Sequence, residues 1–186
     1  MGLIKLFKKE KSVLYNIEIP KGREVLTRDF LLNTPMELRQ EEIFYHIINY
    51  RLNRATVEKY EQVITIQEGY QLIYIILHLQ GEVNNGGYVQ FFDNFENCNT
   101  IVSPYYDLVS KYLKLLNCDA FYKDFLKAKS IYRELRKTTN EELEKKYDEE
   151  LDELDNNFYK NEKLLIESIN EYININIDSF VTKLGA

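Results

Sequence analysis

The chain has 186 residues, enough for one ordinary domain with a substantial core and too few for two of usual size. Its 24 basic and 30 acidic side chains leave a net charge of −6, which argues against a general affinity for nucleic acid, because such affinity depends on Lys and Arg neutralising phosphates. A basic protein partner suits this charge better. The two cysteines, Cys98 and Cys118, are too few for a disulfide framework, and with the two histidines they lack the spacing of a zinc site.

The first 12 residues form a basic segment that lacks the long apolar stretch and the cleavage site of a secretory signal peptide. We therefore expect a cytoplasmic protein with reduced thiols. Residues 13–19 alternate apolar and polar side chains, which leaves one short N-terminal strand or hairpin open. Seven glycines and three prolines are few breakers for this length, so the sequence predicts an all-α fold, a mainly α-helical single domain over residues 13–186.

Two helices are predicted in the first half of the chain. Thr34, Pro35 and Glu37 have the spacing of an N-cap, a first-turn proline and a capping box, and they predict a helix start. From Tyr60 to Gln80 the pattern favours a central helix that becomes apolar almost all round. The polar residues within it are too numerous for a membrane span.

Turn residues interrupt this pattern in the stretch GEVNNGG, residues 81–87. Gly81 is predicted to end the central helix, and Asn85, Gly86 and Gly87 to reverse the chain, because Asn and Gly tolerate the positive φ that other residues avoid. Aromatic residues at 88, 91, 92 and 95 then repeat at the spacing of a buried helical face. The prediction is a helix, a tight reversal and a second, aromatic-faced helix.

Three further helices are predicted toward the C-terminus. Ser103, with a proline in the first turn, starts one, and Asp119 is the expected N-cap of the next. The third begins at two overlapping capping boxes that Thr138 and Thr139 open. Residues 171–180 fit either a helix or a strand, and both are left open.

The strongest charge pattern lies in the last of these helices, where residues 141–155 hold nine carboxylates and two lysines, a local charge of −7. Projected at 100° per residue, apolar side chains fill one arc and carboxylates line both flanks, which predicts an acidic outer surface. Carboxylates one turn apart are about 5–6 Å apart, close to the spacing of successive phosphates, so this surface could imitate DNA or could simply be solvated. The carboxylates predicted to contact a partner are Glu141, Glu144, Asp148, Glu149, Asp152 and Asp155.

No nucleophile elbow, phosphate loop, zinc signature or dinucleotide fingerprint occurs in the sequence. We therefore predict no catalytic residue, no cofactor and no metal, and an interaction module rather than an enzyme. One alternative is left open at the polar turn, residues 82–94, whose amides and carboxylates could line a small-ligand or enzyme site with His78. The other interpretation is that these side chains cap helix ends and bond the reversed backbone.

The stretch EVNNGGYVQFFDN, residues 82–94, resembles the motif of the DNA-mimic-protein-like domain family, most of whose members are described only as domains of unknown function. Residues 153–173 resemble the family's C-terminal helical region, so the likeness covers roughly residues 40–175. The residues that match the motif, which are either structural or line a pocket, are Glu82, Asn84, Asn85, Gly86, Gly87, Tyr88, Gln90, Phe91, Phe92 and Asn94.

The resemblance implies an all-α fold and no enzymatic activity. For the member that gave the family its name, it also implies an acidic surface that occupies the DNA-binding face of a helix-turn-helix transcription factor. We therefore predict a basic protein partner, with such a factor as the leading candidate, and neither direct nucleic-acid binding nor a membrane span. The alternatives are an immunity or antitoxin protein that blocks a basic toxin, and a small-ligand binder or enzyme that uses the polar turn.

Overall fold

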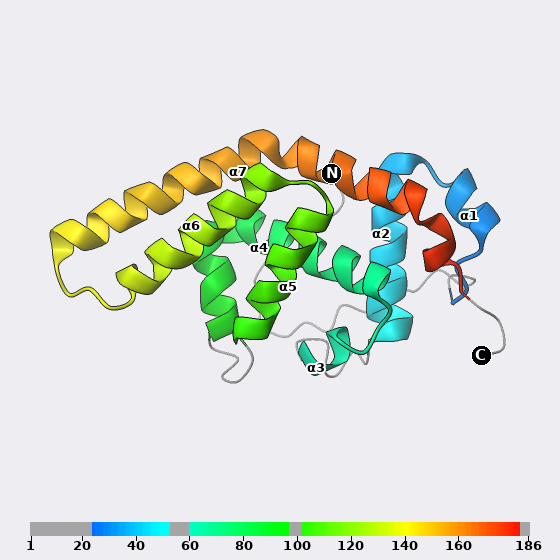
Figure 1. Cartoon of the computed structure of the whole chain (residues 1–186), viewed down its shortest axis with the longest axis horizontal. Helices are drawn as coiled ribbons and strands as arrows, with labels where there is room; N and C mark the ends of the chain where they lie inside the picture. Colours follow the sequence, from blue (N-terminus) through cyan, green and yellow to red (C-terminus); the bar gives the residue numbers. More distant parts are fainter. Residues whose placement is uncertain (1–23, 53–59, 97–101, 183–186) are drawn as a thin grey trace. The chain divides into compact units, whose positions relative to one another are not determined.

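The computed structural model of the chain describes residues 24–52, 60–96 and 102–182 (Figure 1). All regular structure within these ranges is helical, which confirms the prediction of an all-α fold. The strand or hairpin expected at residues 13–19, and the boundary expected between residues 12 and 13, lie outside the described residues and stay predictions. The helices are α1 (Arg28–Asn33), α2 (Met36–His46), the π-helix η2 (Ile47–Arg51), α3 (Tyr60–Val63), α4 (Glu68–Glu96), α5 (Val102–Leu115), α6 (Asp119–Leu135), α7 (Glu141–Ile175) and the 3-10 helix η4 (Ile177–Phe180).

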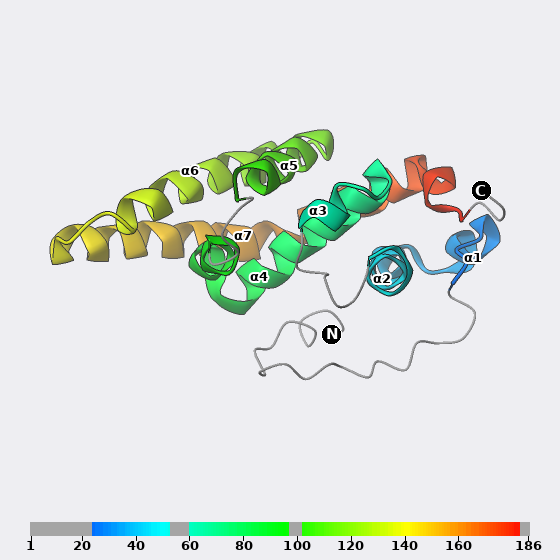
Figure 2. The same cartoon turned by 90° about the horizontal axis from the view of Figure 1, so that it is seen from below.

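The chain divides into two compact units, and the long helices α4 and α7 each contribute to both. The described part of the first unit, residues 78–96 and 102–165, contains the second part of α4, then α5, α6 and the first part of α7. Figures 1 and 2 show α6 and α7 lying side by side as a helical hairpin. Aromatic rings fill the core of the first unit. The ring centroid of Phe92 lies 4.9 Å from that of Tyr132, and the Phe121 ring packs edge-on against Phe158, with the two centroids 5.2 Å apart.

The described part of the second unit contains α1, α2, η2, α3, the start of α4, the end of α7 and η4. The Tyr70 hydroxyl donates to the Phe180 carbonyl at 2.9 Å. Gly69 allows this approach, because a Cβ at that position would lie 3.2 Å from the Phe180 ring. The backbones of Leu26 and Thr182 also bond, with Thr182 N donating to the Leu26 carbonyl at 2.8 Å.

Four predicted helix starts differ from the observed ones. Ser103 is not the N-cap of α5, because it lies within the helix, which begins at Val102. Thr34 does not cap α2; its hydroxyl donates to the Phe30 carbonyl at 2.8 Å and closes α1, a short helix that the sequence analysis left unassigned. Helix α6 begins at Asp119, with Cys118 as its N-cap, one residue earlier than predicted. For α7 the capping side chain is that of Asn140, whose Oδ1 accepts the backbone N–H groups of Glu142 and Leu143 at 2.9 and 3.1 Å.

Two predicted helix boundaries in the middle of the chain are also wrong. The central helix predicted from Tyr60 is broken, because α3 ends at Val63 and α4 begins at Glu68. The Gln71 amide donates to the Ile66 carbonyl at 2.7 Å and so bonds the connecting turn. Gly81 does not end the helix, which continues past it to the two glycines at 86 and 87. At the C-terminal end, helix rather than strand is observed, first α-helical and then 3-10.

Candidate functional site

The predicted chain reversal is a sharp break within α4 at Gly86 and Gly87. Gly86 is extended, with φ −175°, whereas Gly87 has φ 74° and ψ −174°. Only glycine adopts the Gly87 conformation at low cost, because a side chain there clashes with the backbone. Figure 2 shows the part of α4 beyond the break nearly end-on. The prediction of two helices around a reversal at residues 85–87 is therefore confirmed, whereas the helix end predicted at Gly81 is wrong.

The Asp155 side chain of α7 lies directly against this break. Its Oδ1 accepts the backbone N–H of Tyr88 at 2.8 Å. A Cβ built on Gly87 would lie 2.7 Å from the Asp155 Cγ and closer still to Oδ2. Gly87 is thus required twice, for its backbone conformation and for the space that the carboxylate occupies. The helix segment that starts at Tyr88 receives its N-terminal acceptor from another helix, which is an N-cap supplied through tertiary structure.

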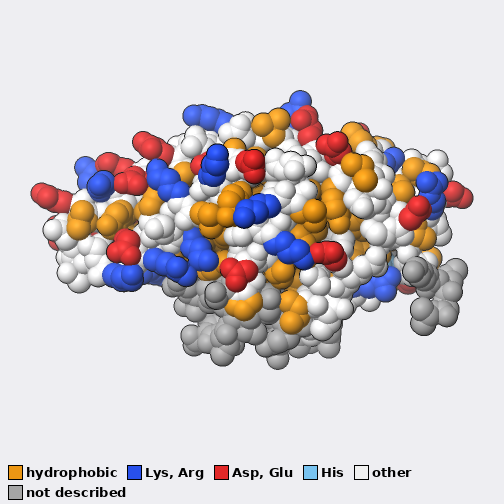
Figure 3. All heavy atoms as spheres, viewed as in Figure 1, with side chains coloured by type: hydrophobic (Ala, Val, Ile, Leu, Met, Phe, Trp, Pro, Cys, Tyr) orange, Lys and Arg blue, Asp and Glu red, His pale blue; other side chains and the backbone are white. Residues whose placement is uncertain are grey.

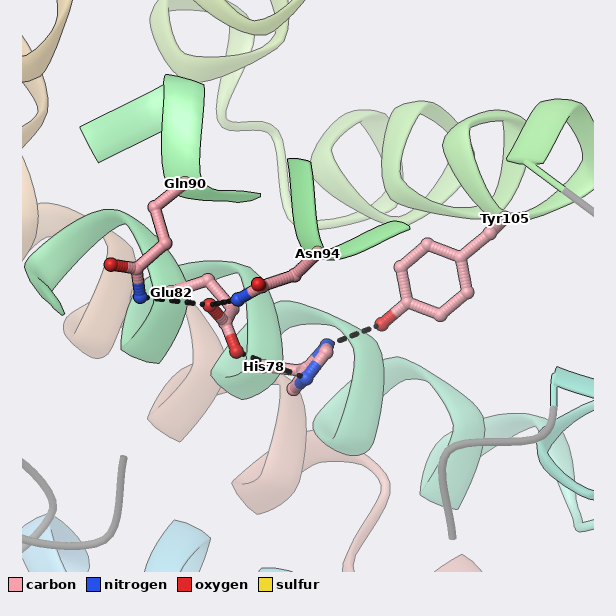
Figure 4. Close-up of polar contacts among 5 residues, drawn as sticks. All are labelled: His78, Glu82, Gln90, Asn94 and Tyr105. Carbon is pink, nitrogen blue, oxygen red and sulfur yellow. Dashed lines mark hydrogen bonds and ion pairs between the residues drawn. The ribbon is translucent and has the colours of Figure 1, made fainter. Parts of the chain in front are cut away.

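A second carboxylate, Glu82, connects the two parts of α4 from the inside of the break (Figure 4). Its Oε2 accepts the side-chain amides of Gln90 and Asn94, which come from the far side of the turn. Its Oε1 lies 3.7 Å from Nε2 of His78, one turn earlier on the same helix. The other ring nitrogen of His78 is 3.0 Å from the Tyr105 hydroxyl of α5. Glu82 is buried, so these contacts replace the water that its carboxylate would otherwise bind.

Glu162, two turns beyond Asp155 on α7, binds the outer side of α4. Its Oε1 accepts the side-chain amides of Gln80, at 2.7 Å, and of Asn84. The Tyr159 hydroxyl donates to the Val83 carbonyl at 3.0 Å. Helix α7 therefore contacts α4 through a row of polar side chains that bond the backbone and amides before and after the break.

The aromatic residues of the motif are core residues. Tyr88, Phe91 and Phe92 are fully buried, and their rings contact α5, α6 and α7. Asp93 lies at the edge of this cluster, where it accepts from the Tyr132 hydroxyl at 2.6 Å and pairs with Arg136. These residues fix how the helices of the first unit pack.

The side chains of Glu82, Asn84, Gln90, Asp93 and Asn94 bond to one another, to His78 or to α6 and α7. The buried Tyr88 hydroxyl, in contrast, has no hydrogen-bond partner among the described residues. These bonds are consistent with side chains that cap and brace the turn. That they line a ligand site stays a prediction. In the described part of the chain, no group of three or more His, Cys, Asp or Glu side chains could hold a metal ion. Of the helices in the described ranges, none has the length and apolar character needed to cross a membrane.

Burial changes the ionisation of two groups around the break. It raises the pKa of the Asp155 carboxyl to about 6; the Tyr88 N–H opposes this rise, and the nearby Asp152 adds to it. Burial lowers the pKa of His78, while the Glu82 charge acts in the opposite direction. Both groups therefore titrate away from their ordinary pH ranges because of where the fold places them.

The acidic half of α7 is mostly exposed, and its carboxylates differ in their contacts. Glu149 lies 3.8 Å from the Lys145 ammonium, and Glu150 lies 3.8 Å from that of Lys146. Asp155 is half-buried and bonded to the break in α4. The remaining predicted contact residues form what we call the acidic stripe, exposed along one arc of the helix: Glu141, Glu144, Asp148 and Asp152.

The kinked helix and the α7 helix that braces it both fall within residues 65–176, which match the family described as DMP19-like protein. The match covers more than half of the chain. The chain belongs to the DMP19-like protein family. This confirms the resemblance that the motif at residues 82–94 indicated. No curated protein and no solved structure shows a significant match to the chain.

In this DMP19-like protein, the roles of Asp155 and Glu162 as acceptors for α4 were not predicted from the sequence. Asp155 was assigned to a partner-binding surface, and Glu162 was not singled out. A signal existed, since residues seven apart lie on one face of a helix, and this pair flanks the buried Phe158. The signal was hidden because the same helix carries many other carboxylates that face solvent.

Proposed function

We propose that this DMP19-like protein is a non-enzymatic interaction module that binds a basic, DNA-binding regulator through the acidic stripe of α7. The observation that carries the proposal is the separation of charges on this helix. Lys145 and Lys146 pair with Glu149 and Glu150, so neither lysine is committed to a carboxylate of the stripe. The stripe therefore presents four exposed carboxylates to a partner.

The spacing of the carboxylates in the stripe suits a surface that contacts the basic side chains with which a protein binds DNA phosphates. Glu141 and Asp152 are 11 residues apart, which corresponds to about 16 Å along the helix axis. Successive carboxylates on this arc are about one helical turn apart, close to the spacing of phosphates on a DNA strand. Family membership supports the same function, since the member that gave the family its name is expected to occupy the DNA-binding face of a helix-turn-helix factor.

The break in α4 supports this function indirectly. Asp155 and Glu162 follow the stripe along α7, and their carboxylates bond this helix to α4. A helix anchored in this way loses less conformational entropy when a partner binds than a mobile one. We therefore assign the motif at residues 82–94 the role of a structural brace for α7 and not that of a ligand site.

The experiment is affinity capture from a lysate of the source organism at low salt. The bait is the full chain, compared with a variant that carries Glu141→Gln, Glu144→Gln, Asp148→Asn and Asp152→Asn. A matched control neutralises four exposed carboxylates outside the acidic half of α7: Glu24, Asp29, Glu37 and Glu171.

A basic DNA-binding protein held by the wild type and the control, and lost from the stripe variant, supports the proposal. The captured regulator should also be released from its own DNA site by added wild-type protein, as judged by gel mobility shift. Equal capture by all three baits would reject the stripe as the binding surface. Capture of a basic nuclease in place of a regulator would favour the immunity-protein alternative.

A further inference from the structure

The acidic stripe and the residues that bond to α4 share one side of α7. Projected at 100° per residue, they lie within an arc about 80° wide that runs for about six helical turns. Lys145 lies about 20° outside this arc, and its ammonium is 3.8 Å from Glu149. We call this side of α7 the acidic arc, and every residue on it is acidic or a tyrosine: Glu141, Glu144, Asp148, Asp152, Asp155, Tyr159 and Glu162.

The second half of the acidic arc binds a helix within the chain, namely the part of α4 before the break. Glu162 accepts the side-chain amides of Gln80 and Asn84, which are four residues apart and so lie on one face of α4. Asp155 accepts the backbone N–H of Tyr88, immediately after the break. Higher residue numbers on α4 thus meet lower numbers on α7, so the two helices run antiparallel.

The first half of the acidic arc is the acidic stripe, and it is open to solvent. The direction of α4 changes at Gly86 and Gly87, and the four carboxylates of the stripe are exposed. This half of α7 runs along α6 toward the closed end of the hairpin, where Figure 3 shows Asp and Glu side chains together with Lys and Arg side chains. The stripe therefore continues a surface whose other half binds a helix.

From this continuity we infer that the acidic stripe receives an α-helix of the partner, antiparallel to α7 as α4 is. The inference rests on the proposed function for the source of that helix. Glu144, Asp148 and Asp152 are four residues apart, so Lys or Arg side chains four residues apart on a second helix come into register with them. The antiparallel direction also places the N-terminus of the partner helix beside Asp152, where a carboxylate favours the positive end of the helix dipole.

The length of the stripe sets the length of the partner helix. Glu141 and Asp152 are about 16 Å apart along α7, which corresponds to about three helical turns. Read from Asp152 back to Glu141, the carboxylates are separated by four, four and three residues. The complementary helix therefore carries basic side chains at positions i, i+4, i+8 and i+11, counted from its own N-terminus.

The test uses the full chain and two synthetic peptides of identical composition, acetylated and rich in alanine. Each is about 20 residues long, so that it forms a helix in water. The first peptide carries lysines at i, i+4, i+8 and i+11, and the second carries the same four lysines distributed around the helix. Circular dichroism checks that both are equally helical. Affinities are measured by fluorescence anisotropy at an ionic strength of about 0.05 M, where surface charges are weakly screened.

The same two chain variants serve as for the proposed function, one with the stripe neutralised and one with four carboxylates neutralised elsewhere. We expect wild type and the control variant to bind the first peptide about tenfold more tightly than the second. The stripe variant should bind both peptides equally weakly. Equal affinity of wild type for the two peptides, or no measurable binding of the first, would overturn the inference.

The direction of the bound helix is read from spin labels on the first peptide. A label at the N-terminus of the peptide should broaden the backbone NMR signals of the chain around Asp152, and a label at its C-terminus should broaden those around Glu141. The opposite pattern would refute the antiparallel arrangement.

The outcome is separable from that of the proposed function, because the peptides carry the charge pattern without the regulator. If the first peptide is preferred and oriented as described but no DNA-binding regulator depends on the stripe for capture, only the proposed function is refuted. If a regulator is captured through the stripe but wild type binds the two peptides equally, only the inference of a docked helix is refuted.

Discussion

The Asp155 carboxylate accepts the backbone N–H of Tyr88 at 2.8 Å, and it occupies the space where a side chain on Gly87 would begin. This one contact joins the family motif on α4 to the acidic helix α7. It explains why a turn motif and a distant charged helix occur in one unit. The motif creates the break, and the helix supplies the acceptor that the break requires.

Replacement of Gly87 by alanine should destabilise the first unit strongly. The backbone at Gly87 has φ 74° and ψ −174°, and the new Cβ would also collide with the Asp155 carboxylate. We expect a loss of about 2–4 kcal/mol in the free energy of unfolding, measured in urea. Gly81→Ala is the control: Gly81 lies in regular helix, so the change should be neutral or stabilising by up to about 1 kcal/mol. Equal effects of the two changes would contradict this account of Gly87.

The raised pKa of Asp155 predicts a specific pH dependence of stability. The unfolded carboxyl ionises near pH 4 and the folded one near pH 6, so the folded state holds an extra proton between these values. The stability gained from this proton is complete below about pH 4, and it is lost as the pH rises through about 6. After allowance for solvent screening at this half-buried group, we expect the loss to be about 1–2 kcal/mol.

Asp155→Asn isolates this effect, because the amide oxygen can still accept the Tyr88 N–H but cannot titrate. Urea unfolding of both proteins from about pH 4 to about pH 8 gives the difference in their free energies of unfolding. As the pH rises, the free energy of unfolding of the wild type should fall relative to that of Asp155→Asn. The difference should then become constant above about pH 7. A difference that does not change with pH would show that Asp155 has an ordinary pKa in the folded protein.

Local rules predicted the parts of this fold that depend on neighbouring residues. The helical periodicity, the aromatic core face at 88–92 and the glycine break follow from backbone preference and spacing. The helix starts at Thr34 and Asp119 were misplaced because each residue has the side chain of an N-cap, and only the position of the preceding segment decides whether it acts as one. Asn140 was overlooked because two threonines beside it matched the capping box better.

The site was harder to predict than the fold, since the important pairs are distant in sequence. Asp155 is 67 residues from Tyr88, and Glu162 is 78 residues from Asn84. A single sequence shows each carboxylate only as one member of an acidic run. Composition correctly located the charge, but the fold decides which carboxylates face solvent and which face α4.

The amide of Asn84 and the carboxylate of Glu162 should be energetically coupled. Glu162 also accepts from Gln80, so Glu162→Ala leaves two amide donors without this acceptor, and we expect a loss of about 1–3 kcal/mol. Asn84→Ala removes one donor and should cost less. In a double-mutant cycle measured by urea unfolding, the coupling energy should be about 0.5–2 kcal/mol. A coupling energy within error of zero would show that this bond does not help to fasten α7.

Asp148 provides a test of whether the acidic stripe is maintained for binding or merely for solubility. Glu144, Asp148 and Asp152 are spaced four residues apart, and like charges at this spacing destabilise a helix by about 0.2–0.5 kcal/mol per pair. Asp148→Asn removes both repulsions, so the free energy of unfolding should rise by about 0.4–1 kcal/mol. Glu149→Gln is a matched control on the same helix, because it loses the Lys145 pair as well as repulsion and should be nearly neutral.

If the stripe binds a basic regulator, Asp148→Asn should weaken capture of that regulator while it stabilises the protein. The control at Glu149 should leave capture close to wild type. Opposite changes in stability and binding at one exposed residue are the mark of a charge retained for function, since a solvated surface offers no reason to keep a destabilising repulsion. If Asp148→Asn stabilises the chain without affecting capture, the carboxylate at this position is not part of the binding surface.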